Sequence, residues 1–161
     1  MENFLKRITL FIVLFIATIV AGHAQETTPV EELVKEIVKK HEDTKGVNCI
    51  SVAKGSGLEM VKIMFNKKFG KEFMKGVTTI TVIDYSDASQ EVCQSLRKDV
   101  DEFLTLLQEF NVSKEKEFAD NDYIRSFALP SDNGTFSDFV VAVENKESKT
   151  IIHMAGEIKV K

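Results

Sequence analysis

The sequence predicts an α+β fold with the element order α-β-α-β-α-β-β-β, in which one sheet carries three helices on one face. The first part of the chain alternates amphipathic helical stripes with short apolar strands, whereas the last part holds three strands in succession. Right-handed crossovers between the early elements predict that the first two strands are parallel. The last three strands predict a C-terminal antiparallel meander.

The N-terminal residues have the pattern of a signal peptide. Basic side chains precede an apolar run from Ile8 to Ala21, and small residues before Ala24 suit cleavage after it. This run is shorter than the roughly 20 residues that a membrane-spanning helix needs. We therefore expect residues 1–24 to be a signal peptide and residues 25–161 to form a single α+β domain. An uncleaved N-terminal anchor is the alternative.

Local signals place the individual elements. Thr28 followed by Pro29 is a typical helix start, and Gly70 is a typical helix end. Asp87 is expected to cap the third and longest helix, with Leu104 in the middle of its buried stripe. The first expected helix starts at Pro29 and is ended by Gly46, and the other two cover 58–69 and 87–110. The expected strands cover 47–53, 77–85, 123–129, 136–144 and 150–160.

Charge and hydropathy exclude several classes of partner. The chain has 25 acidic and 21 basic residues, and this acidic balance argues against nucleic acid or anionic lipid as a partner. No apolar run after the signal peptide is long enough to give a transmembrane segment. An unknown envelope protein or a small ligand is the expected partner.

Two cysteines, Cys49 and Cys93, are present. In an oxidising compartment they could form one disulfide, which would close a loop of about 45 residues. The alternative is two unpaired thiols that pack as small hydrophobic side chains. We favour the unpaired state because Cys49 lies in an expected strand and Cys93 in an expected helix.

No motif identifies a catalytic, cofactor or metal site. Gly55-Ser56-Gly57 lacks the residues of a phosphate-binding loop and predicts a tight turn between strand and helix. His41 ends an apolar helical stripe and His153 alternates with apolar residues on a strand, so we expect both to be packed side chains rather than catalytic bases. Asp120-Asn121-Asp122 lacks the other ligands of an EF-hand and predicts a solvated loop. Asp84 and Asp87 flank the end of an expected strand, where α/β proteins often place sites, and helix capping explains Asp87 without a function.

Three segments resemble a family of exported Bacteroidetes proteins known as a domain of unknown function. They are the strand from Gly46 to Val52, the strand from Val77 to Tyr85 with the helix after it, and the final hairpin that ends in Gly156-Glu157-Ile158. The resemblance implies the periplasm or outer envelope of a Gram-negative bacterium and implies no activity or site residue. Many family members look like lipoproteins, whereas this chain has no cysteine near the cleavage site to accept a lipid.

These observations favour a non-catalytic envelope protein that binds another protein or a small ligand. One alternative is a hydrolase-like enzyme whose site comes together only in the folded chain. Another is a secreted structural or inhibitory module that adds a strand to a partner through the edge of the final meander. An open sheet edge or an exposed apolar patch would favour interaction, and a deep pocket with converging polar groups would favour catalysis.

Overall fold

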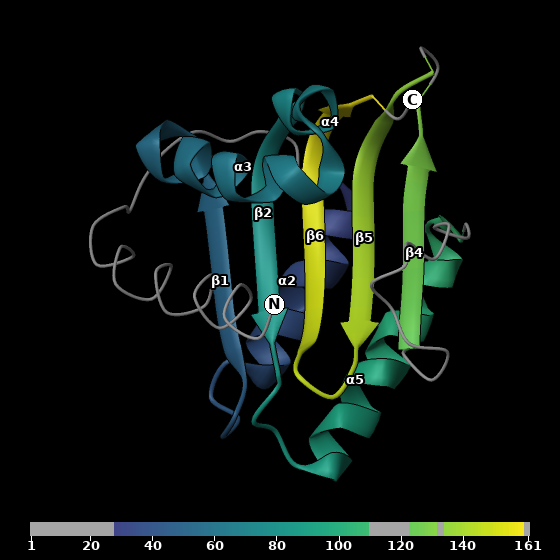
Figure 1. Cartoon of the computed structure of the whole chain (residues 1–161). Helices are drawn as coiled ribbons and strands as arrows, with labels where there is room; N and C mark the ends of the chain where they lie inside the picture. The colour runs from purple at the N-terminus through teal and green to yellow at the C-terminus, as the bar shows by residue number, and fades with distance from the viewer. Residues whose placement is uncertain (1–27, 110–122, 132–133, 160–161) are drawn as a thin grey trace.

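The chain folds into a single open sheet flanked by helices, seen in a computed structural model that describes residues 28–109, 123–131 and 134–159 (Figure 1). The sheet has six antiparallel strands in the order β1-β2-β6-β5-β4-β3. The elements, in chain order, are α2 (Pro29–His41), β1 (Asn48–Ala53), α3 (Gly55–Phe69), α4 (Lys71–Lys75), β2 (Val77–Asp84), α5 (Gln90–Glu102), the 3₁₀ helix η2 (Phe103–Thr105), β3 (Gln108–Glu109), β4 (Tyr123–Pro130), β5 (Phe136–Glu144) and β6 (Lys149–Ile158). The predicted α+β class, the single sheet and the C-terminal meander are confirmed.

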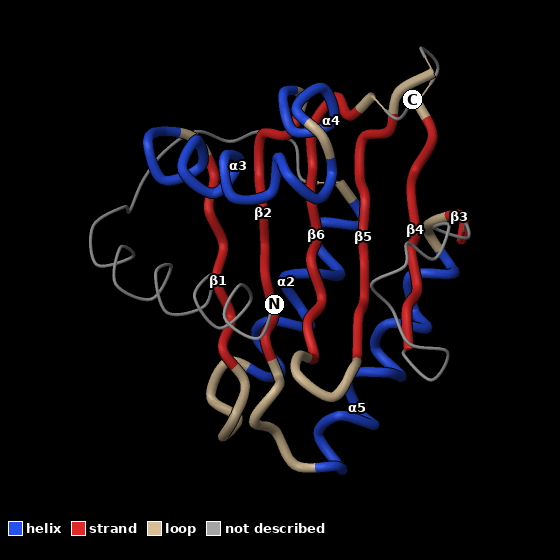
Figure 2. The backbone as a smooth tube through the Cα atoms, viewed as in Figure 1, coloured by secondary structure: helices blue, strands red, loops and turns tan. Residues whose placement is uncertain are grey.

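The helices lie on both faces of the sheet, which corrects the expectation that three helices share one face. Figure 2 shows α3 and α4 in front of the strands and α2 and α5 behind them. The central strands carry apolar side chains at adjacent positions, such as Val82 with Ile83 and Ile151 with Ile152, so both faces must be covered. One core lies under α3 and α4, and a second lies under α2, α5 and η2.

Strands β1 and β2 are antiparallel and not parallel as predicted. Their register is continuous from the pair Asn48–Asp84 to the pair Ala53–Thr79. The helices between them do not run back along β1. Instead, α3 and α4 cross the sheet near the end where β1 finishes, so β2 begins at that same end (Figure 1).

The helix ends show which local signals were sufficient. Helix α2 begins as predicted, because the Thr28 side chain accepts a hydrogen bond from the Glu31 amide at 3.1 Å. Gly70 ends α3 with a positive φ of 87°, also as predicted. Helix α5 is shorter than predicted and is capped by Ser89 in place of Asp87.

The helical stripe predicted through residue 110 is interrupted. Helix α5 ends at Glu102, and the tighter turn of η2 shifts the buried position to Phe103, which has no exposed surface. Leu104, expected in the core, is 49% exposed. The predicted signal peptide, the proposed cleavage after Ala24 and the segment 120–122 lie outside the described residues. Within the described part of the chain, no helix is long and apolar enough to cross a bilayer.

Candidate functional site at the β1 edge

Strand β1 forms one outer edge of the sheet. Its six residues, Asn-Cys-Ile-Ser-Val-Ala, include no charged residue and no proline, and the ladder with β2 has no bulge. Among the described residues β1 pairs only with β2, so every second residue directs its N–H and C=O away from the sheet. Such an edge can accept another strand.

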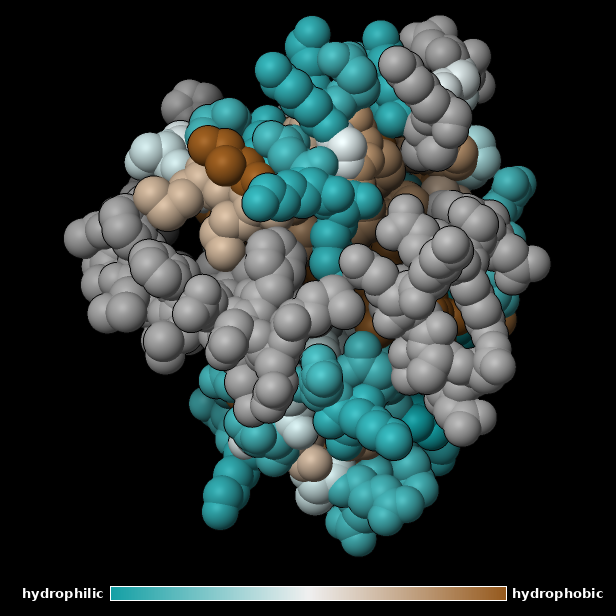
Figure 3. All heavy atoms as spheres, in the orientation of Figure 1, coloured by the Kyte–Doolittle hydropathy of each residue, from teal (hydrophilic) through white to brown (hydrophobic). Residues whose placement is uncertain are grey.

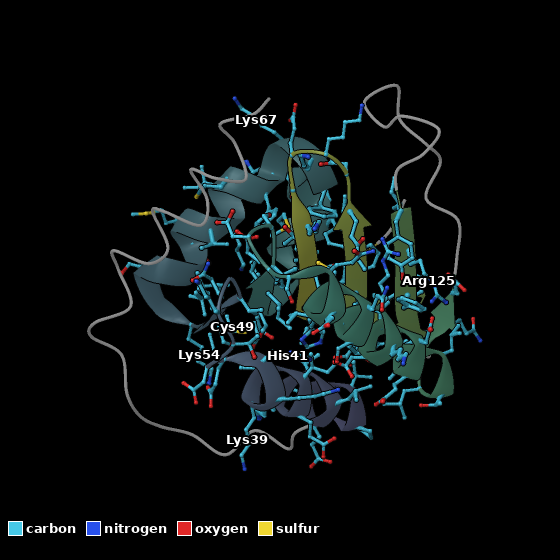
Figure 4. All side chains as sticks on the ribbon, turned by 90° about the horizontal axis from the view of Figure 1, so that it is seen from below. Lys39, His41, Cys49, Lys54, Lys67 and Arg125 are labelled. Atoms are coloured by element: carbon cyan, nitrogen blue, oxygen red, sulfur yellow. The ribbon has the colours of Figure 1, made fainter. Side chains whose placement is uncertain are left out.

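A groove of about 170 Å³ runs beside this edge, between α2 and the first two strands. At its floor the hydroxyl oxygens of Ser51 and Thr81 share a hydrogen bond of 2.8 Å. Figure 4 shows α2 on this side of the sheet, with Cys49 close to it and Lys39 pointing outward. The groove is lined by apolar Val34 and Val38 and by charged or hydroxyl side chains: Glu31, Lys35, Lys39, Glu42, Ser51 and Thr81. It therefore offers an apolar wall, a hydroxyl floor and charges of both signs.

A buried histidine lies next to Thr81 in the sheet and pairs with a buried aspartate. His153 on β6 is the cross-strand neighbour of Thr81, and its Nε2 donates to Asp138 Oδ1 at 2.8 Å. Asp138 also accepts bonds from Thr28 Oγ1 at 3.3 Å and Ser137 Oγ at 3.1 Å, so it ties β6 to the start of α2. His153 is 1% exposed, and its Nδ1 has no hydrogen-bond partner in the described structure.

His41 has a buried carboxylate partner as well. Its Nε2 lies 2.7 Å from Asp99 Oδ2, and the neighbouring Lys40 Nζ lies 2.6 Å from Asp99 Oδ1. Asp99 is buried in α5, so the two contacts hold the end of α2 against α5. A buried carboxylate is stable only when it is paired in this way.

The structure therefore gives each histidine an orienting carboxylate that the sequence did not reveal. The partners are separated by 15 residues for His153 and by 58 residues for His41. The available signal was Asp138 inside the apolar strand Phe136–Glu144, because a buried acid needs a partner. The predicted packing of both histidines is confirmed by their burial.

Cys49 and Cys93 are both free thiols in this structure. Cys93 is buried on α5 and accepts a contact from Lys149 Nζ at 3.3 Å. Cys49 is half-buried on β1. Burial, aided by the negative charge of Glu42, raises the pKa of the Cys49 thiol to about 11, so the thiol is neutral and unreactive near neutral pH.

The remaining sequence candidates have structural roles. Gly55-Ser56-Gly57 forms the first turn of α3 rather than a separate turn before it. Asp84 accepts bonds from the amide and hydroxyl of Ser86, which shapes the turn after β2. The methionines and phenylalanines of α3 and α4 divide: Phe65, Phe73 and Met74 are in the core, whereas Met60 is 44% exposed. No group of three metal-binding side chains occurs within the described ranges.

Charged side chains protect the opposite edge of the sheet. Arg125 on β4 donates to Glu109 Oε1 at 2.7 Å and also pairs with Asp101, while its guanidinium lies 4.9 Å from the Phe127 ring centre. The hydrogen bonds that Arg125 donates to Glu109 raise the pKa of Arg125, and the same bonds lower the pKa of Glu109. Ion pairs therefore protect this edge, whereas β1 has no charged residue.

A similar ion pair anchors α5 to the end of β5. Glu144, buried on β5, accepts hydrogen bonds from Arg97 on α5 and from the Tyr85 hydroxyl at 2.9 Å. Burial, together with the charge of Glu144, raises the pKa of Tyr85. Tyr85 and Arg97 both bond to Glu144, so this cluster accounts for the docking of α5 on the sheet without a ligand.

No family model, curated protein or solved structure matches this chain. The resemblance to the exported Bacteroidetes family therefore stays a prediction.

Proposed function

We propose that this chain is an exported envelope protein that binds an extended segment of a partner protein as an additional strand on β1. The observation that carries the proposal is an edge strand of six uncharged residues with a groove along one side. Backbone hydrogen bonds to β1 would supply affinity, and side chains entering the groove would supply specificity. The function is binding, without a chemical step.

The groove defines which partner segment fits. Alternate side chains of an added strand would lie beside Ser51 and against Val34 and Val38, so an apolar side chain at that position fits best. A second copy of this chain, added antiparallel about a two-fold axis perpendicular to the sheet, would present only Cys49, Ser51 and Ala53 on that face. These side chains are small and would leave the groove unfilled, which favours a different protein as the partner.

A hydrolase-like reaction has one observation in its favour, which is the Asp138–His153 pair next to the Thr81 hydroxyl. A nucleophilic site also needs a hydrogen bond between hydroxyl and imidazole and access for a substrate. The free Nδ1 of His153 makes no such bond, and the ring is 1% exposed. We therefore favour binding over catalysis as the function of this chain.

A peptide library displayed on phage, selected on the immobilised full chain, tests the binding proposal. We expect selected peptides to alternate apolar and polar residues. Ser51→Lys places a charge in the groove near Lys35 and Lys39, and it should weaken their binding by at least about tenfold. Ser131→Lys, the same change at an exposed serine beyond β4, should leave binding unchanged. Thermal unfolding of both variants establishes that they fold.

Two outcomes would contradict this proposal. Peptides that bind Ser51→Lys as well as the original chain would place the site elsewhere. A concentration-dependent dimer that Ser51→Lys abolishes would identify a second copy as the occupant of the edge.

Export is a separate part of the proposal, supported by the pattern of residues 1–24 and by the family resemblance. N-terminal sequencing of the chain from the periplasm or outer envelope of a Gram-negative host should give a first residue of Gln25. A chain that begins at Met1 would contradict cleavage after Ala24.

A further inference from the structure

Helix α3 presents two large apolar side chains to solvent. Met60 is 44% exposed and Ile63 is 69% exposed, although both are large hydrophobic residues. They lie three residues apart on α3, so they share one side of the helix, while Leu58, Val61 and Phe65 pack into the core. Figure 3 shows apolar brown atoms over α3 beside hydrophilic teal atoms of the same region. Packing among the residues that the structure describes does not explain why these two large apolar side chains are exposed.

The same two helices are strongly basic. Residues 54–75 hold six lysines and only two glutamates, although the whole chain has a net charge of −4. One of the two glutamates, Glu59, is paired with Lys62 at 3.2 Å. Five lysines of this segment are exposed: Lys54, Lys67, Lys68, Lys71 and Lys75. The acidic charge of the whole chain therefore hides a local excess of positive charge in this segment.

We propose that the outward surface of α3 and α4 rests on an anionic lipid membrane. Met60 and Ile63 would enter the boundary between headgroups and acyl chains, and the surrounding lysines would contact lipid phosphates. Lysine suits this position, because its long apolar stem lies along the interface while the ammonium stays in water. The proposal goes beyond strand addition at β1, since it uses a different surface.

The charge and the shape of this surface favour a membrane over a folded acidic protein as the partner. An apolar contact with a protein needs a shaped cavity for each side chain, whereas a lipid surface adapts to two separate protruding side chains. On the opposite face of the sheet, α5 has an excess of acidic residues, including the exposed Glu91, Asp101 and Glu102. Repulsion of these acids would turn α3 and α4 toward the lipid. The expectation that an acidic chain avoids anionic lipid is therefore revised for this one surface.

Sedimentation of the full chain with vesicles tests the proposal. Vesicles of phosphatidylglycerol and phosphatidylethanolamine should bind the chain, and vesicles of phosphatidylcholine alone should not. Replacing Lys67, Lys71 and Lys75 by glutamine should weaken binding by about 100-fold. Replacing Met60 and Ile63 by serine, with every charge kept, should weaken it by about tenfold.

The matched control replaces three exposed lysines elsewhere, Lys45, Lys98 and Lys146, by glutamine. It removes the same charge from other surfaces and should retain binding. Equal loss in the control, or no binding to anionic vesicles at low salt, would overturn the proposal. The Met60 and Ile63 variant could still bind vesicles, and the chain could bind polyglutamate equally well. Together these two results would show attraction to any polyanion and would also overturn the proposal. Peptide binding at β1 is measured separately, so either proposal can fail alone.

Discussion

The two edges of the sheet differ in how they are protected. At one edge, β3 comprises Gln108–Glu109 in the described part of the chain, and β4 carries Arg125, which pairs with Glu109 and Asp101. Strand β4 also ends in Pro130 and has a register shift beside it. At the other edge, β1 has six uncharged residues in an unbroken register.

Short edge strands, charges, prolines and bulges are the devices by which proteins prevent unwanted strand pairing. Among the described residues, the β3–β4 edge has charges, a proline and a register shift, whereas β1 has none of these. The unprotected edge is therefore specific to β1, because the other edge of the same sheet is protected. These features oppose strand addition at the β3–β4 edge, and β1 has none that would oppose it.

The largest expected effect on stability comes from removing the Phe103 side chain, which packs under β4 at the protected edge. Phe103 has no exposed surface, and its ring centre lies 6.0 Å from that of Phe127 on β4. Phe103→Ala should lower the free energy of unfolding by about 3–5 kcal/mol through lost burial and a cavity. The adjacent Leu104→Ala, at a half-exposed position, should cost less than about 1 kcal/mol. Denaturant unfolding of both variants measures this, and equal losses would contradict the observed phase of η2.

A smaller effect is expected from removing the charge that protects β4. Arg125→Ala breaks the ion pairs to Glu109 and Asp101 and should cost about 1–2 kcal/mol. The β3 amides should then exchange faster with solvent, and the chain should self-associate more readily. Hydrogen exchange and sedimentation measure the two changes, with Lys98→Ala as a control at an exposed lysine. Unchanged exchange at Gln108 and Glu109 would mean that Arg125 does not hold this edge.

The smallest effect is a pH dependence at the open edge, measured in a Cys93→Ser background. Because burial and Glu42 raise the pKa of Cys49 to about 11, alkylation should be slow at neutral pH and rise as pH approaches 11. Glu42→Gln should lower this pKa. The unfolded thiol titrates near pH 8.5, so the neutral folded thiol contributes stability below that pH, and this contribution is lost as pH rises toward 11. A rate that levels off near pH 8.5 would contradict the burial of Cys49.

Local signals predicted much of the fold. The start of α2 at Thr28 and the end of α3 at Gly70 depend on backbone chemistry within a few residues, and the sequence displays it. The direction of β2 depends on how α3 and α4 cross the sheet, which no local pattern reveals. Leu104 was assigned to the core because a 3.6-residue period was continued through η2.

The candidate site was less predictable because its parts are remote in sequence. Ser51 meets Thr81 across two strands, and α2 closes the groove from a third segment. The sequence predicted strand addition, as one alternative, at the edge of the final meander. The outer strand of that meander, β4, lies at the protected edge. Strand order decides which edge is open, and strand order follows from tertiary packing.

Amide hydrogen exchange of β1, followed by NMR with and without a library-selected peptide, tests the central claim most directly. In the free chain the outward amides of β1 should exchange quickly, and saturating peptide should protect them while β3 and β4 are unchanged. Methylating alternate peptide nitrogens sharpens the test, because only one of the two alternating sets bonds to β1 and only that set should abolish protection. Protection at β3 or β4, or equal effects of both methylated sets, would contradict strand addition at the open edge.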